Sequence, residues 1–432
     1  MIITNARILT FDSANRVYDN GSVEIQPDGT IGAVSTDPPA GDEMIDAGGR
    51  LLMPALINCH THLYSTLARG IALPGRPPKN FPEILQRFWW KLDCALNEED
   101  IYYSALVGLI DSAKAGVGTL IDHHSSPRAC AGSLDRIEQA FREVGLRGAL
   151  CYETSNRNGA VSTAEGIAEN VRFIEKHRKD GMISASFGLH AAFTLSDRTL
   201  DQSVAANQSL RAGFHIHVAE DLCDASAVAR LAKCGILNER TLAAHCLHIT
   251  SRDMAALARH QVNVIHNPQS NCNNAVGIAN VLELAHRGAM VGLGSDGYCP
   301  RMWDEFKTAF HVQKLRTGDP RVAYAEAYAM AFLNNREIVR KAFGMNIGRI
   351  ETGAKADLIL IDYFPPTPLH SGNLFGHLLF GISNAPIDSL IVNGRHIVKD
   401  QHCVTVDEPA VAEKATRQAQ SLWRRFETLC KK

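Results

Sequence analysis

The segment LLMPALINCHTHLYSTLARG, residues 51–70, gives the first indication of both the fold and the functional site. An apolar run typical of a buried strand ends in His60 and His62, which are separated by one threonine. Because successive side chains of a strand point to opposite faces, His60 and His62 are expected to point the same way. The segment therefore predicts a strand that presents two imidazoles side by side where it runs into a loop.

Strand-like runs recur through the middle of the chain and alternate with helical patterns. The eight runs are LLMPALINCH (51–60), GVGTLIDHH (116–124), LRGALCYET (146–154), ISASFGLHA (183–191), AGFHIHVAE (212–220), TLAAHCLHI (241–249), VNVIHN (262–267) and AMVGLGSD (289–296). Helical patterns lie between them, for instance at 164–179 and 227–235. Eight strands alternating with helices are typical of an α/β fold with a TIM-type (β/α)₈ barrel, which we expect over residues 54–353.

Both ends of the chain contain shorter β-type runs separated by turn signals. The first fifty residues carry such signals at DG, PPAGD (38–42) and AGG, and runs of the same kind return in ADLILIDY (356–363) and DSLIVNGRHIVKD (388–400). The NG pair in the last run suits a hairpin turn. We predict that residues 1–53 and 354–405 form a composite β-sandwich domain, followed by a C-terminal helix over 406–432.

The composition narrows the class of protein. The 432 residues include 45% hydrophobic and 21% charged side chains, which is usual for a globular protein. The net charge of −2 favours neither nucleic acid nor a membrane surface as a partner, and no apolar run is long enough to span a bilayer. Eleven cysteines without a CxxC pair, and an N-terminus without secretory features, predict reduced thiols in a cytoplasmic protein.

Imidazoles and carboxylates are concentrated where the predicted strands end. These residues are His60, His62, His123, His124, His190, His215, His217, Glu220, His245, His248 and Asp296. A single histidine at a strand end is usually no more than a hydrogen-bonded residue. In a (β/α)₈ barrel, however, all strands point their C-terminal ends at one face, so these side chains are expected to converge. Several imidazoles with a carboxylate predict a site for a divalent metal ion such as zinc.

Four fragments carry a resemblance to a known family. NCHTH (58–62), HIHVAE (215–220), AAHCLH (243–248) and GLGSDG (292–297), in this order and spacing, resemble the amidohydrolase superfamily. The likeness is greatest to its branch of cytosine, guanine and S-adenosylhomocysteine deaminases and triazine hydrolases. RIETGAKADLILID (349–362) followed by VNGR is similar to the family's ending. HTHLYSTLARG, DHHSSP and HNPQSNCNNAVGIANV resemble most the aminohydrolases called SsnA.

The resemblance implies a role for each matched residue. His60, His62, His217 and Asp296 would bind one metal ion, Glu220 would shuttle protons, His245 would flank the reacting water, and His190 would contact the substrate. Asp296 could also accept a proton from that water. The choice of His217 over His215 rests on the HxxE spacing alone, so His215 stays open as the rival ligand.

The number and kind of metal ions follow from the same comparison. Binuclear members of the superfamily that this chain resembles carry a carboxylated lysine at the end of the fourth strand. The corresponding run here, ISASFGLHAAF (183–193), contains no lysine. We therefore expect one divalent metal ion. Zn²⁺ is the leading choice, and Fe²⁺ or Mn²⁺ would also suit these ligands.

Further substrate contacts are suggested by position and residue type. FPEILQRFWWKLDCAL (81–96) follows the first strand and could form a lid, in which Trp90 could stack on a planar ring. Arg69 and Asp93 are candidate polar contacts, although Arg69 could instead pair with a carboxylate and Asp93 could lie on a solvated helix face. His123 is a candidate substrate contact or, less favoured, a further metal ligand. Asn267, Ser270 and Asn271 could shape the pocket or simply form turns.

Together these features predict a metal-dependent aminohydrolase that deaminates a purine, a pterin or a related nitrogen heterocycle. The alternative is a cyclic-amide hydrolase that opens a ring in purine catabolism, and a triazine hydrolase would use the same site. A non-catalytic scaffold would lack some of the ligands or the glutamate, whereas all six matched positions are occupied. By analogy with the branch, we expect a small heterocyclic substrate and a homodimer.

Overall fold

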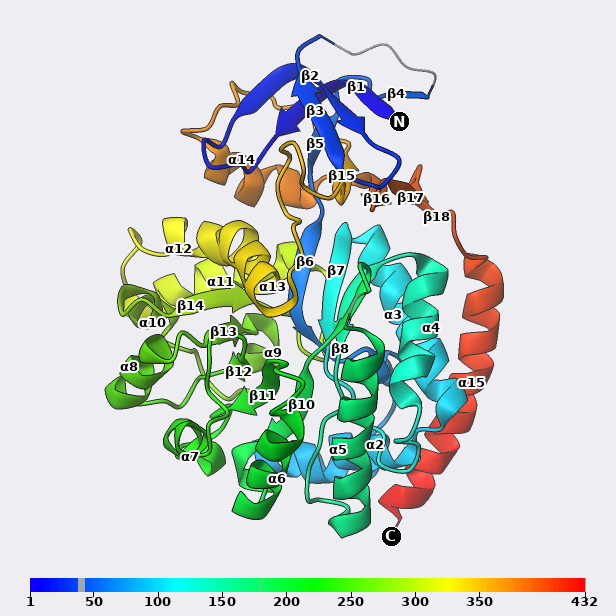
Figure 1. The fold of residues 1–432 in the computed structure, drawn as a ribbon, viewed down its shortest axis with the longest axis vertical. Coiled ribbons are helices and arrows are strands. Elements are labelled where there is room, and N and C mark those ends of the chain that lie inside the picture. The colour runs from blue at the N-terminus through cyan, green and yellow to red at the C-terminus, as the bar shows by residue number, and fades with distance from the viewer. Residues whose placement is uncertain (38–42, 179, 432) are drawn as a thin grey trace.

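The computed structural model describes residues 1–37, 43–178 and 180–431. Figure 1 shows a barrel of strands and helices with a smaller sheet at one end. The turn predicted at 38–42 lies outside the described residues. None of the described helices combines the length and the apolarity needed to cross a bilayer.

The barrel contains all eight predicted strand segments. They are β6 (Leu56–Thr61), β7 (Val117–Asp122), β8 (Arg147–Leu150), β9 (Ile183–Ala185) continued by β10 (Phe187–Ala191), β11 (Phe214–Val218), β12 (Leu242–His245), β13 (Asn263–His266) and β14 (Met290–Leu293). They pair in parallel as β6-β7-β8-β9 and β10-β11-β12-β13-β14. Bridges from Thr61 to Asp296 and from Thr154 to Leu189 join the two sheets. The result is the TIM-barrel-like α/β fold that the alternating pattern predicts.

Helices cover the outside of the barrel. The main ones are α3 (Glu98–Lys114), α4 (Ser133–Val144), α5 (Gly159–Lys176), α6 (Asp197–Asn207), α7 (Ala227–Lys233), α8 (Ser251–Arg259), α10 (Val281–His286), α11 (Met302–Thr317), α12 (Tyr324–Tyr328) and α13 (Asn335–Phe343). Capping boxes begin α3 at Asn97 and α8 at Thr250, where each cap side chain accepts from the third helical residue. The helical patterns at 164–179 and 227–235 correspond to α5 and α7.

The two ends of the chain share one nine-stranded sheet. Its strands are β1 (Ile2–Leu9), β2 (Val17–Ile25), β3 (Ile31–Ser35), β4 (Met44–Asp46), β5 (Leu51–Pro54), β15 (Leu358–Ile361), β16 (Ile387–Val392), β17 (Arg395–Lys399) and β18 (His402–Cys403). The N-terminal and C-terminal parts meet where β5 pairs antiparallel with β15. Asn393 and Gly394 both have positive φ, as the predicted NG hairpin requires. The sandwich arrangement and the exact domain limits stay predictions.

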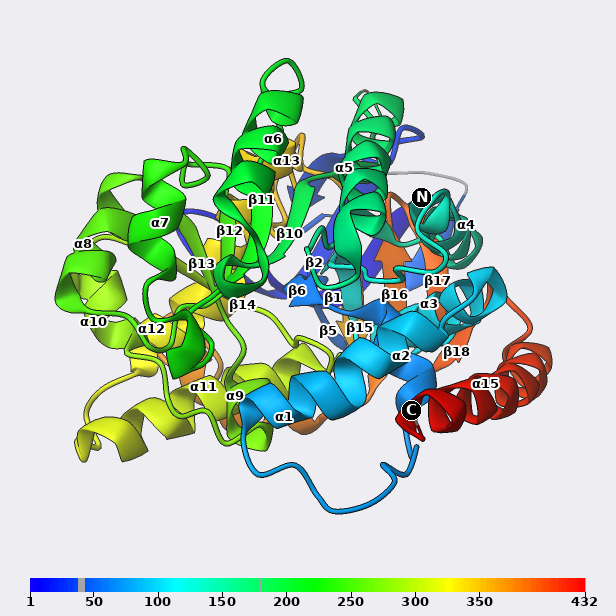
Figure 2. The ribbon, with the colours of Figure 1, turned by 90° about the horizontal axis from the view of Figure 1, so that it is seen from below.

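The chain passes directly from the small sheet into the barrel, because the first predicted run is divided between β5 and β6. A buried ion pair reinforces this junction: Arg147 Nε on β8 lies 2.8 Å from Asp357 Oδ2, next to β15. The C-terminal ends of the barrel strands face away from the small sheet (Figure 1). Across that end lie α1 (Phe81–Ile84) and α2 (Trp90–Ala95), as Figure 2 shows.

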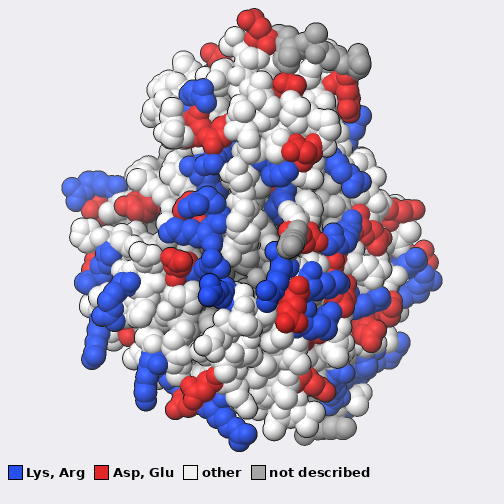
Figure 3. Space-filling view, in the orientation of Figure 1, with Lys and Arg blue, Asp and Glu red and all other residues white. Residues whose placement is uncertain are grey.

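Two helices, α14 (Leu374–Phe380) and α15 (Glu408–Cys430), follow in the C-terminal part of the chain. The second of them, α15, packs along α2 and α3 and corresponds to the predicted C-terminal helix. Basic and acidic side chains both occur across the face shown in Figure 3, in keeping with a net charge of −2.

Candidate metal and proton-transfer site

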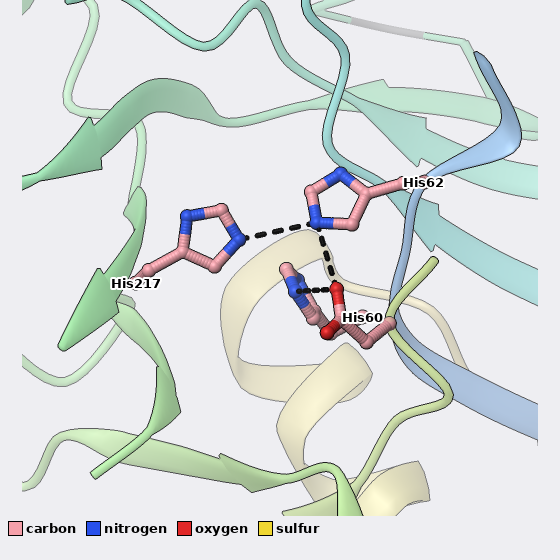
Figure 4. Close-up of side chains that lie close together, drawn as sticks. His60, His62 and His217 are labelled. Carbon is pink, nitrogen blue, oxygen red and sulfur yellow. Dashed lines mark hydrogen bonds and ion pairs between the residues drawn. The ribbon is translucent and has the colours of Figure 1, made fainter. Parts of the chain in front are cut away.

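The four side chains predicted as metal ligands meet at the C-terminal end of the barrel. Their ligand atoms all lie within 4.8 Å of one another. The Nε2 atom of His62 is 3.1 Å from Nε2 of His217 and 2.9 Å from Oδ1 of Asp296. The Nε2 atom of His60 is 3.6 Å from the same Asp296 oxygen. Figure 4 shows the three imidazole rings turned toward this common point.

Local backbone geometry brings Asp296 to this point. A Cβ at Gly294 would lie 2.8 Å from the backbone nitrogen of His60, so only glycine allows the end of β14 to pass this close to β6. The backbone nitrogen of Asp296 then donates to the carbonyl of His60 over 3.0 Å. Asp296 itself adopts a left-handed conformation with φ of 55°, a strained geometry of the kind that clusters at functional sites.

The hydrogen bonds behind the ligands fix the orientation of two imidazoles. Nδ1 of His62 donates to the carbonyl of His123 over 2.6 Å, and Nδ1 of His217 donates to the carbonyl of His190 over 2.8 Å. Because a carbonyl can only accept, Nδ1 carries a proton in both rings, and the two Nε2 atoms face each other. Although burial opposes it, the Asp296 carboxylate raises the pKa of His62 to about 9, so Nε2 of His62 carries a proton in the metal-free protein. A metal ion bound here would displace that proton.

His60 completes a donor set that fits a divalent metal ion. Its Nδ1 atom lies 2.8 Å from Nε2 of His215, and its own Nε2 is buried without a hydrogen-bond partner. Burial lowers the pKa of His60 to about 3, and it also lowers that of His217 well below the usual value, so both rings are neutral, as metal ligands must be. Three imidazole nitrogens and a carboxylate oxygen match the ligands that zinc prefers.

The geometry separates His217 from its rival His215. His215 lies behind His60, where its Nε2 is occupied by the contact with Nδ1 of His60 and its Nδ1 faces the sulfur of Cys151 at 3.7 Å. It belongs to no group of side chains arranged to hold a metal ion among the residues described. The geometry therefore places His217, and not His215, in the cluster that could hold a metal ion, and the ligand role of His217 stays a prediction.

Glu220 and His245 lie directly beside the ligand cluster. The Nε2 atom of His245 is 3.4 Å from Oε2 of Glu220 and 3.9 Å from Oδ2 of Asp296. It is buried and has no hydrogen-bond partner. Burial raises the pKa of Glu220 to about 7. A carboxyl group with a pKa near neutrality can both accept and release a proton, as general acid–base catalysis requires.

Four of these residues, His62, His217, Glu220 and Asp296, line a partly enclosed cavity. The cavity is lined by His62, Tyr64, Phe81, Leu85, Trp89, Trp90, Asp93, Glu153, Arg157, His190, His217, Glu220, Ser270, Asn273, Asn274 and Asp296, among others. The segment 81–95 contributes several of these side chains, so it covers the cavity as a lid would. Trp90, Asp93 and His190 thus lie where substrate contacts were predicted, but their contact with a substrate stays a prediction.

Two of the predicted substrate contacts, Arg69 and His123, do not line this cavity. The side chain of Arg69 is 67% exposed and its guanidinium pairs with Asp111 at 2.7 Å. His123 is completely buried beneath the cavity, where its Nε2 lies 3.1 Å from the carbonyl oxygen of Leu189 and its Nδ1 lies 3.3 Å from Glu153. His124 is also fully buried, and its Nε2 contacts Ser126 at 2.8 Å. Neither histidine reaches the cavity, but His123 lies with His62, Glu153 and His217 in a second group whose ligand atoms are within 4.8 Å of one another, so its alternative role as a metal ligand stays open.

Sequence reasoning missed a buried ion pair in the cavity wall. Arg157 Nη2 lies 2.5 Å from Glu153 Oε1, and Arg157 Nη1 lies 3.3 Å from Asp93. The guanidinium also stands 5.2 Å from the ring of Trp90. Glu153 lies near the end of the third predicted strand run, a position from which the sequence could have predicted that it lies near the site. Arg157 follows in a loop and has no such signal.

Comparisons with known proteins agree with this geometry. A family model described as "Amidohydrolase family" matches residues 51–397. A 5-methylthioadenosine/S-adenosylhomocysteine deaminase of Desulforudis audaxviator is 34% identical, over 88% of this chain and 89% of that protein. A 5′-deoxyadenosine deaminase of Methanosarcina mazei is 30% identical over 98% of both chains.

Solved structures show the same fold. An adenosine deaminase from Xanthomonas campestris with bound zinc superposes with a TM-score of 0.87, at 22% identity over 98% of both chains. An atrazine chlorohydrolase from Arthrobacter aurescens complexed with zinc gives 0.80, at 20% identity over 97% of this chain and 99% of that one. The predicted class of enzyme, a hydrolase acting on C–N bonds, is confirmed. The match over most of its length shows that this chain belongs to the amidohydrolase family.

Proposed function

We propose that this protein is a metal-dependent aminohydrolase that deaminates an adenosine-type purine or a closely related nitrogen heterocycle. The observation that carries the proposal is the placement of Glu220 and His245 against Asp296 at the edge of the ligand cluster, where Glu220 and Asp296 line the cavity. The choice of substrate is supported by the relatives named as deaminases of adenosine-type nucleosides. The choice of zinc is supported by the donor set and by the zinc in the solved structures of the same fold.

The reaction replaces an amino group by oxygen and releases ammonia. When bound, a divalent metal ion would supply a Lewis acid that lowers the pKa of a water molecule toward neutrality. Glu220 protonates the ring nitrogen next to the amino-bearing carbon, which makes that carbon more electrophilic. As the water oxygen bonds to that carbon, Glu220 carries one proton of the water to the amino group, which leaves as ammonia when the C–N bond breaks. The other proton of the water returns to Glu220 as the carbonyl forms.

His245 and Asp296 hold the water in line for this transfer. The lone pair on Nε2 of His245 faces the site and accepts a hydrogen bond from the water, because Nδ1 of His245 already donates to Asn271 over 2.9 Å. Oδ2 of Asp296 lies 3.9 Å from the same Nε2 atom, so the two groups approach the water from neighbouring directions. Proton transfer between positioned groups of this kind contributes roughly 10²–10⁴-fold to the rate.

The cavity has the shape and chemistry for a planar heterocycle. Trp90, Leu85 and Phe81 offer apolar faces on the lid side. His190, whose Nδ1 contacts Thr194 at 2.6 Å, directs its other ring nitrogen toward Glu153 at 3.8 Å. We propose that His190, Trp90 and Asp93 contact the substrate ring or its substituent on the side remote from the metal site.

Product analysis tests the proposal. The zinc-loaded protein is incubated with adenosine, 5′-deoxyadenosine, 5-methylthioadenosine, S-adenosylhomocysteine, guanine, a pterin and a triazine, and products are analysed by mass spectrometry together with released ammonia. Glu220→Gln protein serves as the control for contaminating activity. Exchange of an amino group for oxygen, with stoichiometric ammonia, supports the proposal. A product heavier by a whole molecule of water would instead establish ring opening.

The other predictions also enter as proposals. We propose a cytoplasmic location, a role in purine metabolism and a homodimeric assembly, each of which is open to direct measurement. The pairing of β5 with β15 supports a composite domain made of residues 1–53 and 354–405, proposed as a β-sandwich.

A further inference from the structure

One short helix contacts all three groups of the proton-transfer site. The helix α9 (Pro268–Asn273) follows β13 and ends at Asn274. The hydroxyl of Ser270 donates to Oδ2 of Asp296. Oδ1 of Asn271 accepts from Nδ1 of His245 over 2.9 Å, and Nδ2 of Asn274 donates to Oε1 of Glu220 over 3.4 Å.

Each contact determines which atom of its partner faces the reaction. Asn271 engages Nδ1 of His245 and leaves Nε2 as the atom that faces Glu220. Ser270 engages Oδ2 of Asp296 and leaves Oδ1 toward His60 and His62. Asn274 engages Oε1 of Glu220 and leaves Oε2 toward His245. The three contacts thus select one arrangement of three side chains that could each present either of two atoms.

The helix is held from its other side by a buried carboxyl group. The backbone nitrogen of Gln269, in the first turn of α9, donates to Oε2 of Glu305 over 3.2 Å. Glu305 belongs to α11 and is completely buried. Burial raises its pKa well above the usual value, so it remains neutral and does not compete for the cation site. A buried anchor of this kind fixes the position of the helix relative to the barrel.

We propose that Asn271 is a positioning residue that sets the tautomer of His245, and that α9 aligns His245, Glu220 and Asp296 as one unit. The amide oxygen of Asn271, 2.9 Å away, requires a proton on Nδ1 of His245, which keeps the lone pair on Nε2 directed at the reacting water. The amide nitrogen of Asn267, which would favour the opposite tautomer, is farther from the same atom at 3.5 Å. The effect of Asn271 on catalysis rests on the proposed function. The tautomer of His245 does not, since it is a property of the metal-free protein.

Nuclear magnetic resonance of protein labelled with ¹⁵N-histidine measures this tautomer directly. The His245 signal is assigned by its loss in the His245→Gln variant. We expect wild-type His245 to be protonated on Nδ1, and Asn271→Leu, which has a similar size but no acceptor, to shift it toward the Nε2-protonated form. Asn271→Asp retains the acceptor and should retain the wild-type tautomer. Protonation on Nε2 in the wild type would overturn the proposal, even if Asn271→Leu failed to fold.

Kinetics separate positioning from a merely structural role. Removing a partner that hydrogen-bonds a site residue typically lowers activity by roughly 10–100-fold, so we expect Asn271→Leu to lower kcat by about that factor, with KM and zinc content unchanged. Asn271→Asp should recover most of kcat. Cys272→Ala changes an exposed neighbour in the same helix and is the matched control, expected to behave as wild type. Equal kcat in Asn271→Leu and wild type would overturn the proposal, and so would a joint loss of kcat, KM and zinc binding. Absence of any turnover in the wild type would instead refute the proposed function and leave the tautomer measurement valid.

Discussion

Replacing Glu220 with glutamine should stabilise the metal-free protein against unfolding. The same change should abolish the activity of the zinc-loaded protein. Glu220 has only 12% of its side chain exposed, and burial raises its pKa from 4.5 to about 7. A shift of this size corresponds to about 3 kcal/mol of folding free energy, since each pKa unit is worth about 1.4 kcal/mol. Glutamine keeps the size of the side chain and never carries the charge.

The sign of the effect gives it a characteristic pH dependence. The folded protein binds the Glu220 proton more tightly than the unfolded chain does, so the cost of the charged form is absent below pH 4.5 and complete above pH 7. The Gln variant should therefore have about the same free energy of unfolding as the wild type at acidic pH. At pH 8 it should be more stable by about 3 kcal/mol.

Urea titrations with a chelator, followed by tryptophan fluorescence at pH 5 and pH 8, measure this difference. Glu413 lies on α15 and its side chain is 69% exposed, so Glu413→Gln serves as the control. Its free energy of unfolding should differ little from that of the wild type at either pH. The zinc-loaded Glu220→Gln protein should bind metal normally and show no measurable turnover, because it lacks the group that carries the protons. The reasoning is refuted if the stability difference between variant and wild type is the same at both pH values, or if turnover persists.

Four further substitutions test the junction between the domains, the ligand set and the position of Arg69 outside the cavity. Asp357→Ala leaves Arg147 buried and unpaired, so urea titration should show a loss of about 3–5 kcal/mol, and an unchanged midpoint would contradict this. His60→Ala and Asp296→Ala should lower zinc content measured by elemental analysis, whereas full occupancy would remove that residue from the ligand set. Arg69→Ala breaks only an exposed pair and should change stability by less than about 1 kcal/mol, with kcat/KM unaltered. A large fall in kcat/KM would restore Arg69 as a substrate contact.

The barrel could be predicted from the sequence because its strands are buried on both faces and appear as apolar runs. The convergence of His60, His62, His217 and Asp296 could be anticipated for the same reason, since parallel strands of a barrel end at one face. The division of the fourth strand into β9 and β10 carries no such signal. It depends on how the backbone nitrogen of Ser186 bonds to the carbonyl of Leu150 on the neighbouring strand.

Side-chain direction limited the prediction of the remaining site residues. His123 directly follows β7, just as His62 directly follows β6. The ring of His123 nevertheless turns toward Glu153 beneath the cavity and does not enter the cavity. Arg69 is close to the ligands in sequence, yet the 3₁₀ turn at Leu63–Ala68 carries it outward to Asp111. Arg157 enters the cavity wall from a loop, through contacts with Asp93 and Glu153 that only the tertiary structure brings together.

The most direct test of the central claim is a reaction of the zinc-loaded protein with adenosine-type substrates in ¹⁸O-labelled water. The account predicts a product in which one labelled oxygen replaces the amino group, one ammonia per product, and no reaction with Glu220→Gln. An unlabelled product, or one that has gained a whole molecule of labelled water while retaining its amino group, would contradict it.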